Sequence, residues 1–152
     1  MLYIRFMTSP ALSLFYVDDA APPAPLNRID PPLAAGFPSP ADDYLEDRID
    51  LTRELVRNPT STFLARVRGE SMVDAGLRDG DLVLIDRSLS PRPGSMVLAW
   101  VDDGFTVKTL HRRDGRFWLR AANPAFPDLE LHPEDNPHIW GVVTHVIHRQ
   151  QL

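Results

Sequence analysis

The chain has 152 residues, a formal net charge of −5 and no cysteine. This length suits one domain of ordinary size with tails and is short for two domains. The acidic balance, without a dense run of Lys or Arg, argues against a protein that holds nucleic acid by neutralising phosphates, so we expect no direct DNA binding. Without cysteine, disulfides, thiolate metal sites and a cysteine nucleophile are excluded.

The apolar beginning, residues 1–17, is the one segment that could be taken for a secretory signal. Arg5 interrupts its apolar run, Pro10 breaks it, and no basic segment precedes it, so we do not expect a signal peptide. No apolar run approaches the roughly 18 residues that would span a bilayer. We therefore expect a soluble, cytoplasmic protein without a membrane partner.

Proline dominates the first part of the chain. Each proline removes a backbone donor and fixes φ, which excludes a regular helix or a central strand there. We predict an extended arm over residues 1–43, with a strand-like piece near residues 12–17; from composition alone, a disordered tail is the alternative. Eight of the 15 prolines lie in the first 41 residues: Pro10, Pro22, Pro23, Pro25, Pro31, Pro32, Pro38 and Pro40.

Residues 44–152 are predicted to form the folded unit, an all-β domain. A short helix over 51–57 is expected first, because Asp50 can cap it and Pro59 ends it. Short segments rich in β-branched and aromatic residues then alternate with turn residues, which is typical of mostly antiparallel strands. The expected strands are 63–67, 82–86, 95–101, 105–110, 117–121, 129–131 and 139–148, with hairpin turns at Asp103-Gly104 and Asp114-Gly115.

One serine lies where a nucleophile could be presented. Gly69-Glu70-Ser71-Met72 directly follows the expected strand 63–67 and precedes the turn Asp79-Gly80-Asp81. A serine at a glycine-flanked strand end can point its hydroxyl outward while nearby backbone N–H groups converge on the group it attacks. Serines in such places are more often turn formers or caps, so the motif by itself is a weak signal.

A lysine stands inside the alternating strand Phe105-Thr106-Val107-Lys108. A strand lysine is usually solvated or protects a sheet edge. If it were instead partly buried, it would be driven toward its neutral form and could accept a proton as a general base. Its pKa would have to fall well below the model value of about 10.4 for this to operate near neutral pH.

Together these blocks resemble the LexA/UmuD family of self-cleaving proteins, in which a lysine follows the serine at a spacing similar to that between Ser71 and Lys108 here. The arm resembles the UmuD branch in particular, through Ala35-Gly36-Phe37-Pro38-Ser39-Pro40-Ala41 and Arg48-Ile49-Asp50-Leu51. Near the carboxyl end, Gly141-Val142-Val143-Thr144-His145-Val146 is similar too. The resemblance covers about residues 33–148.

The resemblance implies roles for particular residues. Ser71 is the expected nucleophile and Lys108 the expected general base of a Ser/Lys dyad. The backbone N–H groups of Glu70 and Ser71 are expected to form the oxyanion hole, and the bond cut is Ala35-Gly36. Two small residues at that bond would let an extended substrate lie close to the serine.

The resemblance also implies a biological role. Members cut off their own arm when stimulated by RecA on single-stranded DNA during the SOS response. The trimmed form is then expected to serve a UmuC-type translesion polymerase as an accessory subunit. A homodimer is implied, and no cofactor is expected.

Several alternatives differ in class. A repressor would need a DNA-binding helix-turn-helix before the cut, which a proline-rich, non-basic arm cannot supply. A signal-peptidase-like enzyme would share the Ser/Lys chemistry, but we expect no membrane anchor. A Ser-His-Asp triad would need one of the five histidines beside Ser71, and no G-x-S-x-G nucleophile elbow is present. The histidines also show no metal-binding spacing. A non-cleaving interaction module of the same fold, with a vestigial dyad, stays open.

Overall fold

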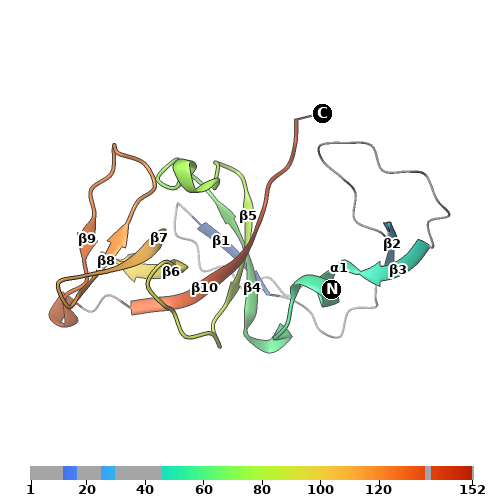
Figure 1. Cartoon of the computed structure of the whole chain (residues 1–152), viewed down its shortest axis with the longest axis horizontal. Coiled ribbons are helices and arrows are strands. Elements are labelled where there is room, and N and C mark those ends of the chain that lie inside the picture. The colour runs from blue at the N-terminus through green and yellow to red at the C-terminus, as the bar shows by residue number, and fades with distance from the viewer. Residues whose placement is uncertain (1–11, 17–24, 30–45, 136–137, 152) are drawn as a thin grey trace. The chain divides into compact units, whose positions relative to one another are not determined.

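The computed structural model describes residues 12–16, 25–29, 46–135 and 138–151 (Figure 1). Its contacts divide the chain into two units, one of residues 1–18 and 58–152 and the other of residues 19–57. The larger unit contains one eight-stranded antiparallel sheet, ordered β1-β4-β5-β10-β6-β7-β8-β9. The predicted all-β fold is therefore confirmed.

The expected strands agree closely with those of the sheet. The largest difference is β7, which begins one residue earlier and ends three residues later than expected. The strands are β1 (Leu12–Tyr16), β4 (Thr62–Val67), β5 (Leu82–Asp86), β6 (Met96–Val101), β7 (Gly104–Arg113), β8 (Arg116–Arg120), β9 (Leu129–Glu130) and β10 (His138–Ile147). Single turns of 3-10 helix lie at Pro59–Ser61, Val73–Ala75 and Pro133–Asp135.

Two tight hairpins join β6 to β7 and β7 to β8. In the first, Val101 pairs with Gly104, so the two-residue turn is Asp102-Asp103 rather than the expected Asp103-Gly104. Both aspartates have positive φ, which short polar side chains tolerate. The second turn is Asp114-Gly115, as expected, again with both φ values positive. These hairpins place β7, and Lys108 within it, between two strands.

The long strand β10 connects the two halves of the sheet. Its first half pairs with β6 and its second half with β5. The register shifts between Ile139 and Gly141 against β6 and between Val143 and His145 against β5. A Cβ on Gly141 would lie 2.6 Å from the side chain of Ile85, so the crossing requires a residue without a side chain.

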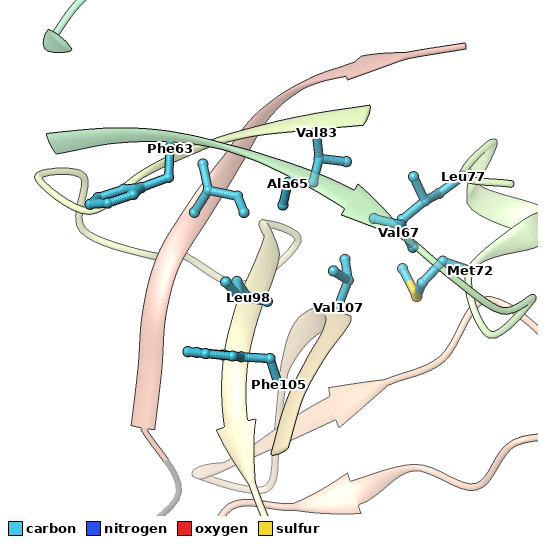
Figure 2. Close-up of a cluster of buried hydrophobic side chains, with 10 residues drawn as sticks. Phe63, Ala65, Val67, Met72, Leu77, Val83, Leu98, Phe105 and Val107 are labelled. Atoms are coloured by element: carbon cyan, nitrogen blue, oxygen red, sulfur yellow. The ribbon is translucent and has the colours of Figure 1, made fainter. Parts of the chain in front are cut away.

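The main core lies against β4, β5, β6 and β7 (Figure 2). Alternate residues of β4, Phe63, Ala65 and Val67, are buried in it, as the period of two predicts. Met72 and Leu77 also enter this core, although they belong to the connection between β4 and β5. That connection carries Ser71, so burial of two large side chains fixes it to the sheet.

The smaller unit contains an antiparallel pair, β2 (Pro25–Ile29) and β3 (Glu46–Asp50), followed by the helix α1 (Leu51–Leu55). Asp50 caps the helix by accepting hydrogen bonds from the N–H groups of Thr52 and Arg53, as predicted. The β2–β3 pair was not predicted. Pro25 is the first residue of its strand, a position where a missing N–H is tolerated.

Candidate active site

The serine motif begins directly after β4, where the backbone turns sharply. Gly69 has φ of +95°, a conformation that side-chain-bearing residues rarely adopt. Its N–H donates to the Asp79 carboxylate at 2.7 Å, which ties the beginning of the loop to the Asp79-Gly80 turn. The positive φ at this position therefore explains why a glycine precedes Glu70 and Ser71.

The predicted nucleophile and base lie together. Lys108 Nζ is 3.0 Å from Ser71 Oγ, although the residues are 37 positions apart in the chain. Ser71 comes from the β4–β5 connection and Lys108 from the middle of β7. The distance is within the range in which a base can accept a hydroxyl proton.

Lys108 is almost completely buried, with 7% of its surface exposed. Burial lowers the pKa of its amine below the ordinary value of 10.5, because the charged form loses its hydration. Among the described residues no carboxylate forms an ion pair with it that would hold the charge. The amine of Lys108 therefore loses its proton more readily than that of a solvated lysine at a sheet edge.

Two further acceptors surround the amine. Lys108 Nζ lies 2.8 Å from Thr106 Oγ1 and 3.0 Å from the Val107 carbonyl oxygen. A neutral amine has two N–H donors and one lone pair. If the donors go to these two oxygens, the lone pair is left for the hydroxyl hydrogen of Ser71.

The sequence alone did not assign a role to Thr106. It belongs to the quoted strand motif, and residues two apart on a strand share a face. That spacing is the signal that could have paired it with Lys108.

An open groove of about 390 Å³ runs beside the dyad. Glu70, Ser71 and Lys108 are among the residues that line it. Within the described part of the chain, the N–H groups of Glu70 and Ser71 donate to no acceptor. Other lining residues are Arg68, Gly69, Val101, Asp102, Gly104, Phe105, Thr106, Phe126, Pro127 and Leu129.

The loop between β8 and β9 supports the serine motif from another direction. Asn123 Nδ2 donates to the Glu70 carbonyl oxygen at 2.9 Å. The neighbouring Ala122 accepts a backbone hydrogen bond from Asp74 at 2.8 Å, and its own N–H contacts the Met72 sulfur at 3.4 Å. Sequence reasoning missed these contacts, since they join residues about fifty positions apart without a local pattern.

The other predictions from the sequence concern the cleaved bond, a metal site, a histidine beside Ser71 and a membrane span. Ala35 and Gly36 lie outside the described residues. In the described ranges no cluster of three His, Cys, Asp or Glu side chains is arranged to hold a metal, and the hydroxyl of Ser71 contacts no histidine. His148 instead pairs with the buried Asp81 at 2.6 Å. None of the described helices has the length and apolar character of a membrane span.

Comparison with known proteins gives one consistent result. The model of the family "Peptidase S24-like" matches residues 29–144. Protein ImpA of Salmonella typhimurium is 47% identical over 115 residues, or 76% of this chain and 78% of that protein. Protein MucA of Escherichia coli is 43% identical over 114 residues, or 74% and 77%. A LexA repressor of Nocardioides is 40% identical over 135 residues, which cover 88% of this chain and 52% of the repressor.

Proposed function

Because the chain belongs to the Peptidase S24-like family of self-cleaving serine proteases, we propose that Ser71 and Lys108 cut its own Ala35-Gly36 bond. The observation that supports this most directly is the 3.0 Å contact between Ser71 Oγ and a buried lysine amine of lowered pKa. We assign residues 1–43 to the arm that carries the bond and residues 44–152 to the catalytic domain.

The chemistry follows from these groups. Ser71 Oγ attacks the Ala35 carbonyl carbon while its proton passes to Lys108. The negative charge on the former carbonyl oxygen is stabilised by the N–H groups of Glu70 and Ser71. The intermediate collapses, the Ala35-Gly36 bond breaks, and Lys108 returns the proton to the leaving amine of Gly36. Water then hydrolyses the Ser71 ester and releases the carboxylate of Ala35.

The rate of self-cleavage in such a protein has to be limited by its conformation. The substrate is part of the same chain, so its effective concentration is high whenever the arm can reach the groove. Slow cutting then means that the arm docks productively for a small part of the time. In the proposed function, RecA assembled on single-stranded DNA raises that population, and the trimmed protein serves a UmuC-type translesion polymerase.

The product masses test the bond assignment. Purified protein, incubated at about pH 10 to deprotonate lysine, and separately near neutral pH with RecA, an ATP analogue and single-stranded DNA, should yield residues 1–35 and 36–152. Gly36→Trp should suppress cutting under both conditions, because the indole would block approach of the Ala35 carbonyl to Ser71. Mass spectrometry reads both results. Fragment masses that correspond to cleavage at another bond would overturn the assignment of Ala35-Gly36.

A homodimer is the second part of the proposal, and β10 supports it. Beyond Val142, none of the described strands pairs with the edge of β10 that faces away from β5. Val146 and Ile147 are exposed there, at 38% and 39%. An open edge with apolar side chains is a ready template for pairing with another chain.

We expect sedimentation to give a dimer at micromolar concentration and a shift toward monomer in Val146→Lys, because a charge at this edge opposes pairing. Leu89→Lys, at another exposed apolar residue, is the matched control and should leave the dimer intact. A wild-type monomer, or equal loss in both variants, would count against pairing through β10.

A non-cleaving interaction module of the same fold is the alternative. It would keep the fold and the partner surfaces but produce no fragments. An unchanged mass in both incubations described above would favour this alternative. The buried lysine beside Ser71 argues against it, because a protein that only binds partners does not need such a pair.

A further inference from the structure

The Glu70 carbonyl has a fixed direction. It accepts a hydrogen bond from Asn123 Nδ2 at 2.9 Å and another from the Val73 N–H at 3.3 Å. The orientation of the Asn123 amide is determined by its partners, because its Oδ1 accepts from the Ala125 N–H at 2.9 Å while its nitrogen faces a carbonyl that can only accept. Both ends of the side-chain amide are therefore occupied.

The same peptide unit contains the Ser71 N–H. In a trans peptide the C=O and the following N–H lie in one plane and point in opposite directions. Holding the Glu70 carbonyl toward Asn123 therefore turns the Ser71 N–H away from Asn123. In the described part of the chain that N–H has no acceptor, and Ser71 lines the groove.

We propose that Asn123 is a positioning residue for the oxyanion hole. Its amide holds the Glu70-Ser71 peptide in the orientation that directs the Ser71 N–H toward the charge developing on the scissile carbonyl. Asn123 lines a separate hollow of about 450 Å³ and not the groove, so it acts on the substrate through this peptide. This proposal rests on the proposed self-cleavage.

The surroundings of Asn123 suit such a role. Pro124 follows it and restricts its backbone to extended conformations, which lowers the cost of holding the side chain in place. Backbone contacts between Ala122 and the β4–β5 connection do not involve the Asn123 side chain. A change of that side chain should therefore leave the loop docked.

The informative variant is Asn123→Asp, which keeps the acceptor for Ala125 and loses the donor for Glu70. Removing one oxyanion donor costs about 100- to 1000-fold in rate; a misdirected donor should cost somewhat less, about ten- to hundredfold in the self-cleavage rate at high pH. Asn123→Ala, which introduces no charge, should give a similar loss. The pH midpoint of the Ala variant should equal that of wild type, because Thr106 and Val107 still surround Lys108. Asp128→Asn, on the same loop, is the matched control and should cut like wild type.

A second reaction separates chemistry from arm docking. A phosphonofluoridate reacts with Ser71 without the arm: the Oγ–P bond forms, fluoride leaves and the hydroxyl proton passes to Lys108. We expect Asn123→Asp and Asn123→Ala to slow this labelling by about the same factor as self-cleavage, since the phosphonyl oxygen also needs the hole. Mass spectrometry of the full-length chain measures the rate.

The outcomes are distinct. Wild-type protein that neither cuts itself nor takes the label would overturn the proposed function. Wild-type protein that does both, with Asn123 variants labelled at the wild-type rate, would overturn the role of Asn123 alone. A shifted pH midpoint in Asn123→Ala would overturn it too, because the residue would then act through Lys108.

Discussion

Replacing Ser71 with alanine is expected to abolish self-cleavage, and replacing Lys108 with alanine is expected to slow it by at least about a hundredfold, the usual contribution of a general base. The reason is the direct contact of the two side chains, 3.0 Å apart. Lys108→Arg should be equally inactive, because a guanidinium stays protonated and cannot accept the serine proton. Gel electrophoresis and mass spectrometry of the purified variants after incubation at high pH measure the loss.

The fold should survive these changes. Ser71 lies at the surface of the groove, and Ser71→Ala should leave the thermal midpoint within a few degrees of wild type. Thr109→Ala, one residue from Lys108 but on the opposite face of β7, is the matched control and should still cut. Cutting at the wild-type rate by Ser71→Ala or by either Lys108 variant, free of contaminating protease, would rule out the dyad.

Unassisted self-cleavage is expected to accelerate with pH. Lys108 acts as a base only when neutral, so the rate should rise about tenfold per pH unit while it is mostly protonated and then reach a plateau. Since burial lowers the pKa of Lys108, the midpoint should lie below 10.5. Initial rates between pH 6 and pH 11, about the range that brackets a depressed lysine pKa, give the profile.

Thr106→Val provides the control for that profile. It removes the hydroxyl that contacts Lys108 Nζ at 2.8 Å and keeps the side-chain volume. Loss of a group that also stabilises the charged amine should move the midpoint to lower pH. A variant that only weakens arm docking should instead lower the plateau and leave the midpoint unchanged. A flat wild-type profile, with the same products throughout, would contradict the general-base role.

Burying this lysine also has a cost for stability. Its folded-state pKa is below the unfolded value, so the unfolded chain binds the proton more readily. Stability is therefore reduced while pH is below the folded-state pKa and is recovered as pH rises through it toward the unfolded value. The protein thus gives up stability at physiological pH in order to keep a base in place.

The sequence by itself determined the strands of the large sheet, the turn at Asp114-Gly115 and the positions of the serine and the lysine, but not the β2–β3 pair or the exact turn between β6 and β7. Strand 82–86 and the turn Asp114-Gly115 were predicted correctly because a short apolar run bounded by turn residues, and turn chemistry itself, are local properties. The helix cap at Asp50 is local in the same way. The pairing of Ser71 with Lys108 came from resemblance to a family and not from any local rule.

The tertiary structure alone decided the properties on which the reactivity of the site depends, namely the burial of Lys108 and the orientation of the Glu70-Ser71 peptide. Lys108 is buried because β6, β7 and the β4–β5 connection meet around it, and no pattern within β7 encodes that meeting. The contact between Asn123 and Glu70 joins residues 53 positions apart. Hydrogen bonds of this kind depend on where the sheet brings two loops together, and a sequence read along its length contains no periodic signal for them. Desolvation and peptide orientation are consequences of packing, so they became visible only once the chain was folded.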